Sequence, residues 1–280
     1  MNLRRVPSRG RVAVPSLAAG VLLALSLPPW GWWPLGLVGA GLLYWRLAGL
    51  RVRARVWSGW LAGLGCYAIG LFWARSFNWY GAVVLVLVEA LFFAAAAAAT
   101  PPQRGRAAAF VGACTLAECL RMAWPFGGLP LGGVFLGQAQ GPLVQLARLG
   151  GPLLITAGVW AGGVVLATLA ARVRAVHRHR TGPALAGAAA LAVGIVALVL
   201  VGAVAPDGGS PVRMLRVALV QGGGQRGLSK QEVAPSTVLT AQLAATFPVT
   251  TARPRPSWSC GPRTSWRSTA SWPAHPRRPG

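Results

Sequence analysis

Few residues of this chain could do chemistry, because only four of its 280 residues are acidic. Glu118 and Arg121 lie three residues apart in an apolar segment, so a helix would place them on one face, within reach of an ion pair. Glu89 lies in the middle of another apolar segment, with no basic residue nearby in sequence. Charged groups in such surroundings are costly and often functional. The pair has two interpretations: an intramembrane functional site, or a helix-end ion pair that fixes packing.

Cysteine and histidine offer no further site. Cys260 lies in a segment rich in Arg, Pro and Ser without a partner carboxylate, so we do not expect it to act as a nucleophile. His177 and His179 lie among arginines, whose charge would repel a metal cation. The other cysteines lie in apolar segments without metal-ligand spacing, where a thiol is usually a small packing residue: Cys66, Cys114 and Cys119. We therefore expect no metal and no cofactor.

The composition indicates a membrane protein. Apolar residues make up 54% of the chain and charged residues only 11%, whereas a soluble surface carries about a quarter or more. The net charge of +23 would suit a nucleic-acid partner if the basic residues formed one surface. They lie instead in short clusters between apolar segments or after residue 251. We therefore expect membrane-topology charges and no nucleic-acid partner.

Seven apolar segments are candidates for membrane spans, each of which needs about 20 residues. The first ends at a Pro-Pro-Trp-Gly-Trp-Trp-Pro run, residues 28–34, which combines helix-stopping prolines with aromatic residues suited to a membrane interface. The sequence thus predicts an all-α polytopic bundle. Its expected spans are 13–28, 33–50, 56–74, 79–99, 107–124, 150–171 and 183–205.

The arginines predict the orientation of this bundle. With the N-terminus in the cytoplasm, only three arginines before the last span lie in outer segments: Arg75, Arg121 and Arg148. The inner segments then hold fourteen: Arg4, Arg5, Arg9, Arg11, Arg46, Arg51, Arg53, Arg55, Arg104, Arg106, Arg172, Arg174, Arg178 and Arg180. This asymmetry follows the positive-inside rule. It places everything after about residue 206 outside the cytoplasm.

The segment after the last span has a different pattern. Residues 206–212 are turn-rich, and 217–220 form a short buried-strand pattern that runs into a Gly-rich turn. Residues 233–246 could form a helix, with Val238, Leu239, Leu243 and Ala244 on one face. This order suits the start of an α/β sandwich. After about residue 247 the periodicity is lost.

Several motifs in order carry a specific resemblance. They are Pro28-Pro29-Trp30, Glu118-Cys119-Leu120-Arg121, Phe126-Gly127-Gly128-Leu129-Pro130, Leu136-Gly137-Gln138 and Val217-Ala218-Leu219-Val220-Gln221-Gly222. Together, over about residues 13–246, they resemble the apolipoprotein N-acyltransferase family. The candidate motif or structural residues are therefore Glu118, Arg121, Gly128, Pro130, Gln138 and Gln221.

The resemblance implies a multi-pass enzyme of the bacterial cytoplasmic membrane with an external nitrilase-like αββα domain. Its implied activity takes a fatty acyl chain from a phospholipid as a thioester on a Cys. The chain then passes to the N-terminal S-diacylglyceryl-cysteine of an apolipoprotein. A Glu base, a Lys and the nucleophilic Cys form the implied triad. The oligomeric state stays open.

The triad glutamate of the family follows Trp-Pro, a string that this chain lacks. Ser259 to Trp266 admit the codons TCG TGT GGC CCG AGA ACG TCG TGG, which from the third nucleotide read Val-Trp-Pro-Glu-Asn-Val-Val. We therefore interpret 247–280 as an out-of-frame, disordered tail. It would follow a transmembrane domain (1–206) and the N-terminal fragment of a nitrilase-like domain (213–246).

On this interpretation no catalytic residue is present, and the chain is a catalytically incomplete acyltransferase. Two alternatives remain. One is a non-enzymatic polytopic membrane protein whose basic tail binds anionic lipid or a protein partner. The other is a split enzyme whose catalytic half is a separate chain.

Overall fold

The structure is a computed structural model that describes residues 9–76, 78–103, 105–124, 128–176, 184–205, 217–220, 222, 234–251 and 258–260. The chain divides into two compact units, Met1–Pro206 (unit 1) and Asp207–Gly280 (unit 2). Each unit is built by contacts of its own.

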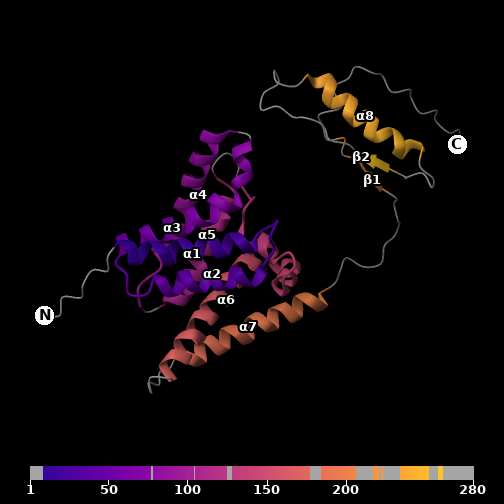
Figure 1. The fold of residues 1–280 in the computed structure, drawn as a ribbon. Coiled ribbons are helices and arrows are strands. Elements are labelled where there is room, and N and C mark those ends of the chain that lie inside the picture. The colour runs from indigo at the N-terminus through magenta and orange to yellow at the C-terminus, as the bar shows by residue number, and fades with distance from the viewer. Residues whose placement is uncertain are drawn as a thin grey trace. The chain divides into compact units, whose positions relative to one another are not determined.

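The described part of unit 1 is helical (Figure 1). Three short 3-10 helices connect its α-helices: η1 (Phe72–Ser76), η2 (Val134–Gln138) and η3 (Pro142–Leu146). The α-helices are α1 (Arg9–Ser26), α2 (Trp33–Arg46), α3 (Val52–Gly70), α4 (Trp79–Ala99), α5 (Arg106–Arg121), α6 (Ala147–Val176) and α7 (Ala184–Val204).

Each α-helix of unit 1 falls on one of the apolar segments found in the sequence, which confirms a helical membrane protein. Three described helical stretches are long and apolar enough to cross a bilayer: Trp79–Ala99, Pro142–Arg174 and Gly187–Val204. Helix α2 has 14 residues and rises about 21 Å, less than the roughly 30 Å of a hydrocarbon core. The seven-span count therefore stays a prediction.

Several helix boundaries differ from the expected ones. Helices α2, α3 and α5 end at Arg46, Gly70 and Arg121 rather than at residues 50, 74 and 124. Helix α1 ends at Ser26, just before the proline pair, rather than at residue 28. Helix α6 begins at Ala147 and ends at Val176, beyond the expected 150–171 at both ends. It contains a kink, where Gly151 has φ 63° and ψ −157°. Glycine adopts this conformation readily because it has no Cβ atom.

Small residues allow the helices of unit 1 to approach closely. A Cβ added at Gly63 of α3 would lie 2.7 Å from the Cα of Ala90 in α4. A Cβ at Gly163 of α6 would lie 2.7 Å from the backbone nitrogen of Gly41 in α2. Such small-residue contacts are a main means of helix packing in membranes.

An aromatic chain runs through the core of unit 1. Tyr67 of α3 packs edge-to-face on Phe93 of α4, with ring centres 5.6 Å apart. Trp160 of α6 lies 5.8 Å from Phe93 and 5.4 Å from Phe110 of α5. Phe110 in turn lies 5.2 Å from Tyr44 of α2. These tilted and edge-to-face contacts, favoured by the ring quadrupoles, join five helices.

Unit 2 contains a strand–helix–strand arrangement: β1 (Val217–Leu219), α8 (Pro235–Thr251) and β2 (Trp258–Cys260). The strands pair in parallel, with Val217 opposite Trp258 and Leu219 opposite Cys260. Parallel pairing requires a crossover connection, which contains α8. The helix also contacts the end of β1, since the Gln242 amide donates to the Val220 carbonyl (3.0 Å) and accepts from the Gly222 N–H (2.8 Å).

The division at residue 247 into a nitrilase-like fragment and an out-of-frame tail stays a prediction, but the described elements extend beyond it. Helix α8 continues to Thr251, and residues 258–260 form a strand inside the segment expected to be disordered. The three-residue strand has too little periodicity to be seen in the sequence, and its pairing with β1 is a tertiary contact. The nitrilase-like identity of this unit stays a prediction.

Candidate functional site

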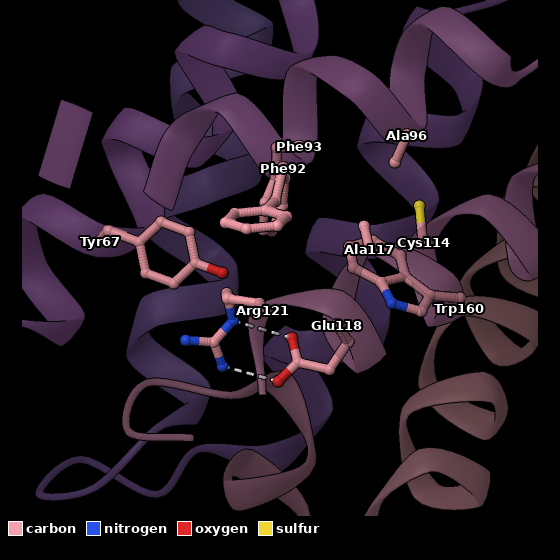
Figure 2. A pocket seen from close by; sticks show the side chains of 9 residues that line it. All are labelled: Tyr67, Phe92, Phe93, Ala96, Cys114, Ala117, Glu118, Arg121 and Trp160. Carbon is pink, nitrogen blue, oxygen red and sulfur yellow. Dashed lines mark hydrogen bonds and ion pairs between the residues drawn. The ribbon is translucent and has the colours of Figure 1, made fainter. Parts of the chain in front are cut away.

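The centre of the candidate site is Arg121, the last residue of α5, whose side chain is fully buried. Its Nη2 donates to Glu118 Oε1 at 2.6 Å and its Nε to Glu118 Oε2 at 3.4 Å. Figure 2 shows the two side chains facing each other in this forked arrangement. Bidentate contacts of this kind are the most specific that Arg makes with a carboxylate. The ion pair expected from the three-residue spacing is thus present.

A second carboxylate reaches the same guanidinium from another helix. Glu89 of α4, also fully buried, lies with Oε2 3.4 Å from Arg121 Nη1. The sequence had indicated no partner for Glu89, because 32 residues separate it from Arg121. The other oxygen of Glu89, Oε1, is buried without a hydrogen-bond partner.

Backbone carbonyls complete the surroundings of Arg121. Its Nη1 donates to the carbonyls of Leu129 (2.5 Å) and Leu131 (3.0 Å), and its own carbonyl accepts from the Leu129 N–H at 3.0 Å. Arg121 therefore binds α4, α5 and the 129–131 loop together. Tyr67 contributes its ring, with the guanidinium carbon 5.4 Å from the ring centre, a cation–π distance.

Glycines let this loop approach the ion cluster. Gly128, a predicted motif residue, has φ +89°, and a Cβ there would collide with the Met122 carbonyl. A Cβ at Gly133 would lie 2.6 Å from Glu118 Oε1. Pro130 lies exposed in the same loop, and its carbonyl accepts from the Gly133 N–H at 3.3 Å.

The cavity beside the ion cluster is narrow. Its volume is about 10 Å³, roughly what one water molecule needs. Figure 2 shows the aromatic walls around Arg121 and Glu118. Its lining residues are Tyr67, Phe92, Phe93, Ala96, Cys114, Ala117, Glu118, Arg121 and Trp160. A fatty acyl chain does not fit into this space.

Gln138 belongs to a different buried group. Its Nε2 donates to the Trp33 carbonyl at 3.2 Å, which ties η2 to the start of α2. Its Oε1 is buried without a partner, and a Cβ at Gly141 would lie 2.5 Å from that oxygen. Gln221, the remaining candidate, lies outside the described residues, as do His177 and His179.

The one lysine of the chain, Lys230, lies outside the described residues, so the described part contains no Glu-Lys-Cys set. Within that part, no group of three or more His, Cys, Asp or Glu side chains could hold a metal ion. Cys66 and Cys114 are buried free thiols, and Cys119 is exposed. The residues that sequence reasoning did not connect are Glu89, Tyr67 and the loop carbonyls. One signal for Glu89 was available: a buried acid needs a partner, and Arg121 lies inside another apolar segment.

Comparison with known proteins identifies a family whose members resemble this chain. The family model described as "Apolipoprotein N-acyltransferase N-terminal domain" matches residues 19–165, which include all three members of the ion cluster. Two relatives named "Apolipoprotein N-acyltransferase" are 33% identical to this chain. The one from Azotobacter vinelandii matches over 235 residues, 76% of this chain and 43% of its own length. The one from Pseudomonas paraeruginosa matches over 174 residues, 56% of this chain and 32% of its own length.

A third relative with the same name, from Pseudomonas putida, is 34% identical over 186 residues, 60% of this chain and 35% of that protein. The matched part of the chain thus spans less than half the length of each of these relatives. The family match covers more than half of the chain and the complete ion cluster. The chain belongs to the apolipoprotein N-acyltransferase family.

Proposed function

We propose that this chain contributes the membrane domain of an apolipoprotein N-acyltransferase. In that reaction a fatty acyl chain passes from a membrane phospholipid to the α-amino group of the N-terminal S-diacylglyceryl-cysteine of an apolipoprotein. The observation that carries the proposal is the match of residues 19–165 to the N-terminal domain of this family.

The Arg121 cluster has a positioning role in this proposal rather than a catalytic one. Its guanidinium already binds two carboxylates and two loop carbonyls, and the cavity beside it holds about one water. The cluster would keep α4, α5 and the 129–131 loop in one arrangement. Of the two interpretations of the Glu118–Arg121 pair, packing is the better supported.

The proposed chemistry has two covalent steps. A cysteine thiolate attacks the ester carbonyl of the phospholipid, and the lysophospholipid alcohol leaves with a proton. The α-amino group then attacks the thioester, the thiolate leaves, and a general base takes the amine proton. Donors such as a lysine ammonium stabilise the oxyanion in each step.

We propose that the 280-residue chain does not itself contain the catalytic residues for this reaction. The chain has one lysine, Lys230, and no acidic residue after Glu232. Cys260 pairs through its backbone with Leu219 of β1 and has no carboxylate near it in sequence. We therefore assign no catalytic residue.

The β1–α8–β2 arrangement supports the proposal that unit 2 begins a nitrilase-like domain. In the shifted reading frame the glutamate codon falls across Pro262 and Arg263, directly after β2. A catalytic residue just beyond the end of a parallel strand suits the usual position of sites in α/β folds.

The coding DNA tests the frame hypothesis directly. We expect TGT at Cys260 and AGA or AGG at Arg263, because these spellings are needed for Trp-Pro-Glu. A TGC codon at Cys260 or a CGN codon at Arg263 would contradict the frame hypothesis.

We propose a cytoplasmic N-terminus in the bacterial cytoplasmic membrane and an external unit 2, on the strength of the arginine asymmetry. Reporter fusions at residues 175 and 215 should then report opposite sides. Two fusions on the same side would show that the span count is wrong.

Complementation tests the function. A strain depleted of its own N-acyltransferase receives one of two genes. The first encodes the 280-residue chain. The second is identical except for one nucleotide inserted before the Ser259 codon, so that translation continues in the shifted frame. Mass spectrometry of a lipoprotein N-terminus should find N-acylation only with the frame-corrected gene. N-acylation by the 280-residue chain alone would disprove its incompleteness.

A second candidate function rests on the six arginines after Thr251, a segment without acidic residues. A non-enzymatic membrane protein could use this basic tail to bind anionic lipid or a protein partner. Binding to anionic liposomes that is lost on removal of residues 252–280, with no acylation from the corrected gene, would favour it.

A further inference from the structure

A groove of about 360 Å³ lies between the C-terminal halves of α2 and α6. This volume is within the range of about 300–1,000 Å³ that is usual for small-molecule sites. The residue numbers rise together along both helices, so Trp45 and Arg174 lie at one end, with the guanidinium carbon 6.0 Å from the ring centre. The rest of the lining is apolar or small: Val38, Gly41, Leu42, Leu166, Ala167 and Ala170.

Arg174 has no counter-ion among the described residues. The two described acids, Glu89 and Glu118, both pair with Arg121. The Arg174 side chain is exposed at the end of the groove. It is therefore available to an anion from outside the described residues.

We propose that the groove binds one anionic phospholipid, with an acyl chain along the apolar wall and the phosphate at Arg174. Guanidinium groups bind phosphate through short, charge-assisted hydrogen bonds. Trp45 is the kind of residue that lies at the level of lipid headgroups. An anionic lipid matches both the apolar wall and Arg174, whereas a free anion matches only Arg174.

This lipid differs from the acyl donor of the proposed reaction. Arg148, at the start of α6, donates to the carbonyls of Gly202, Ala203 and Ala205 at the end of α7. The end of α7 therefore lies beside the start of α6. Arg174 lies 26 residues further along α6, at most about 39 Å of helix. The groove thus lies at the other end of α6 from Ala205, the last described residue of unit 1, and it does not depend on the acyl-transfer proposal.

Native mass spectrometry of the purified full chain in neutral detergent tests the proposal. The probes are phosphatidylglycerol, phosphatidylcholine with the same acyl chains, and glycerol phosphate. We expect phosphatidylglycerol to bind about tenfold more tightly than phosphatidylcholine. The phosphatidylglycerol headgroup carries a net negative charge that Arg174 can neutralise. In phosphatidylcholine the choline group already neutralises the phosphate. R174Q should remove this preference, and R174K should retain most of it.

The matched control is R75Q, which removes one charge from η1, where Arg75 stacks on Phe72. R75Q should leave the preference unchanged. A170F and V38W fill the groove and should weaken binding of both phospholipids, with thermal unfolding used to confirm that each variant is folded. Equal binding of the two phospholipids, or equal effects of R75Q and R174Q, would overturn the proposal. The proposal would also be overturned if glycerol phosphate bound as tightly as phosphatidylglycerol and A170F did not change its binding. That result would identify a site for a free anion.

Discussion

Unit 1 contains arginine in two kinds of surroundings. Arg121 is fully buried, binds two carboxylates and two carbonyls, and leaves only a cavity of about 10 Å³ beside it. Arg174 is exposed at the end of a groove of about 360 Å³ and pairs with no described carboxylate. The charge of Arg121 is neutralised inside the protein, whereas Arg174 is open to an anion from outside the described residues. The difference separates a residue that holds the bundle together from one available to bind a ligand.

The largest effect should come from Arg121→Leu. It leaves two carboxylates buried without a cation, which typically costs about 3–5 kcal/mol. The apparent midpoint of thermal unfolding in detergent, followed by tryptophan fluorescence, should fall sharply. Arg121→Lys keeps the charge but not the fork, so its loss should be smaller. An unchanged midpoint in Arg121→Leu would mean that the cluster does not stabilise unit 1.

Gly133→Ala should act on the same cluster without removing a charge. The new Cβ would collide with the Phe135 ring and lie 2.6 Å from Glu118 Oε1, so the ring, the carboxylate or the loop must move. Overpacking of this kind costs about 1–3 kcal/mol. The matched control is Gly187→Ala, on α7, where an added Cβ meets nothing within 4 Å. Equal unfolding midpoints for the two variants would contradict the close approach of the loop.

The two carboxylates should not contribute equally. Glu118 binds Arg121 through both oxygens, with one contact at 2.6 Å, whereas Glu89 makes one contact at 3.4 Å and has an unpartnered Oε1. Glu118→Gln should therefore cost about 2 kcal/mol and Glu89→Gln about 1 kcal/mol. Guanidinium denaturation of the two variants in one detergent measures the order. A larger loss in Glu89→Gln would reverse our assignment of the main partner.

The smallest effect should come from Arg174→Gln in the absence of added lipid. An exposed side chain without an ion-pair partner contributes less than about 0.5 kcal/mol. The variant should differ from the natural chain only when phosphatidylglycerol is present, because ligand binding stabilises the folded state. A large loss without lipid would mean that Arg174 has a structural partner and belongs to the same class as Arg121.

One half of the candidate site, the Glu118–Arg121 pair, could be predicted from the sequence because the two residues are close together in the chain. Glu118 and Arg121 lie on one face of a helix, so their pairing follows from helix geometry. Glu89 was recognised as unusual, but its partner lies on another helix. Leu129 and Leu131 carry no side-chain signal at all, because they contribute only carbonyl groups.

Unit 2 shows the same division. The strand at 217–219 was predicted from its apolar pattern before a Gly-rich turn. The strand at 258–260 was not, because its identity depends on pairing with β1 across a connection that includes α8. A three-residue segment cannot indicate a distant partner through its own periodicity.

The sequence by itself determined that this protein is a helical membrane protein, since apolar length and scarce charge are local properties that the bilayer selects for. It also determined the family, through motifs that keep their order along the chain. Only the tertiary structure decided which helices meet and therefore which charges are paired. Gly63 lies against Ala90, the residue that follows Glu89, and such contacts depend on the shapes of two helix surfaces at once. That is the reason why Arg121 is paired within the protein and Arg174 is not.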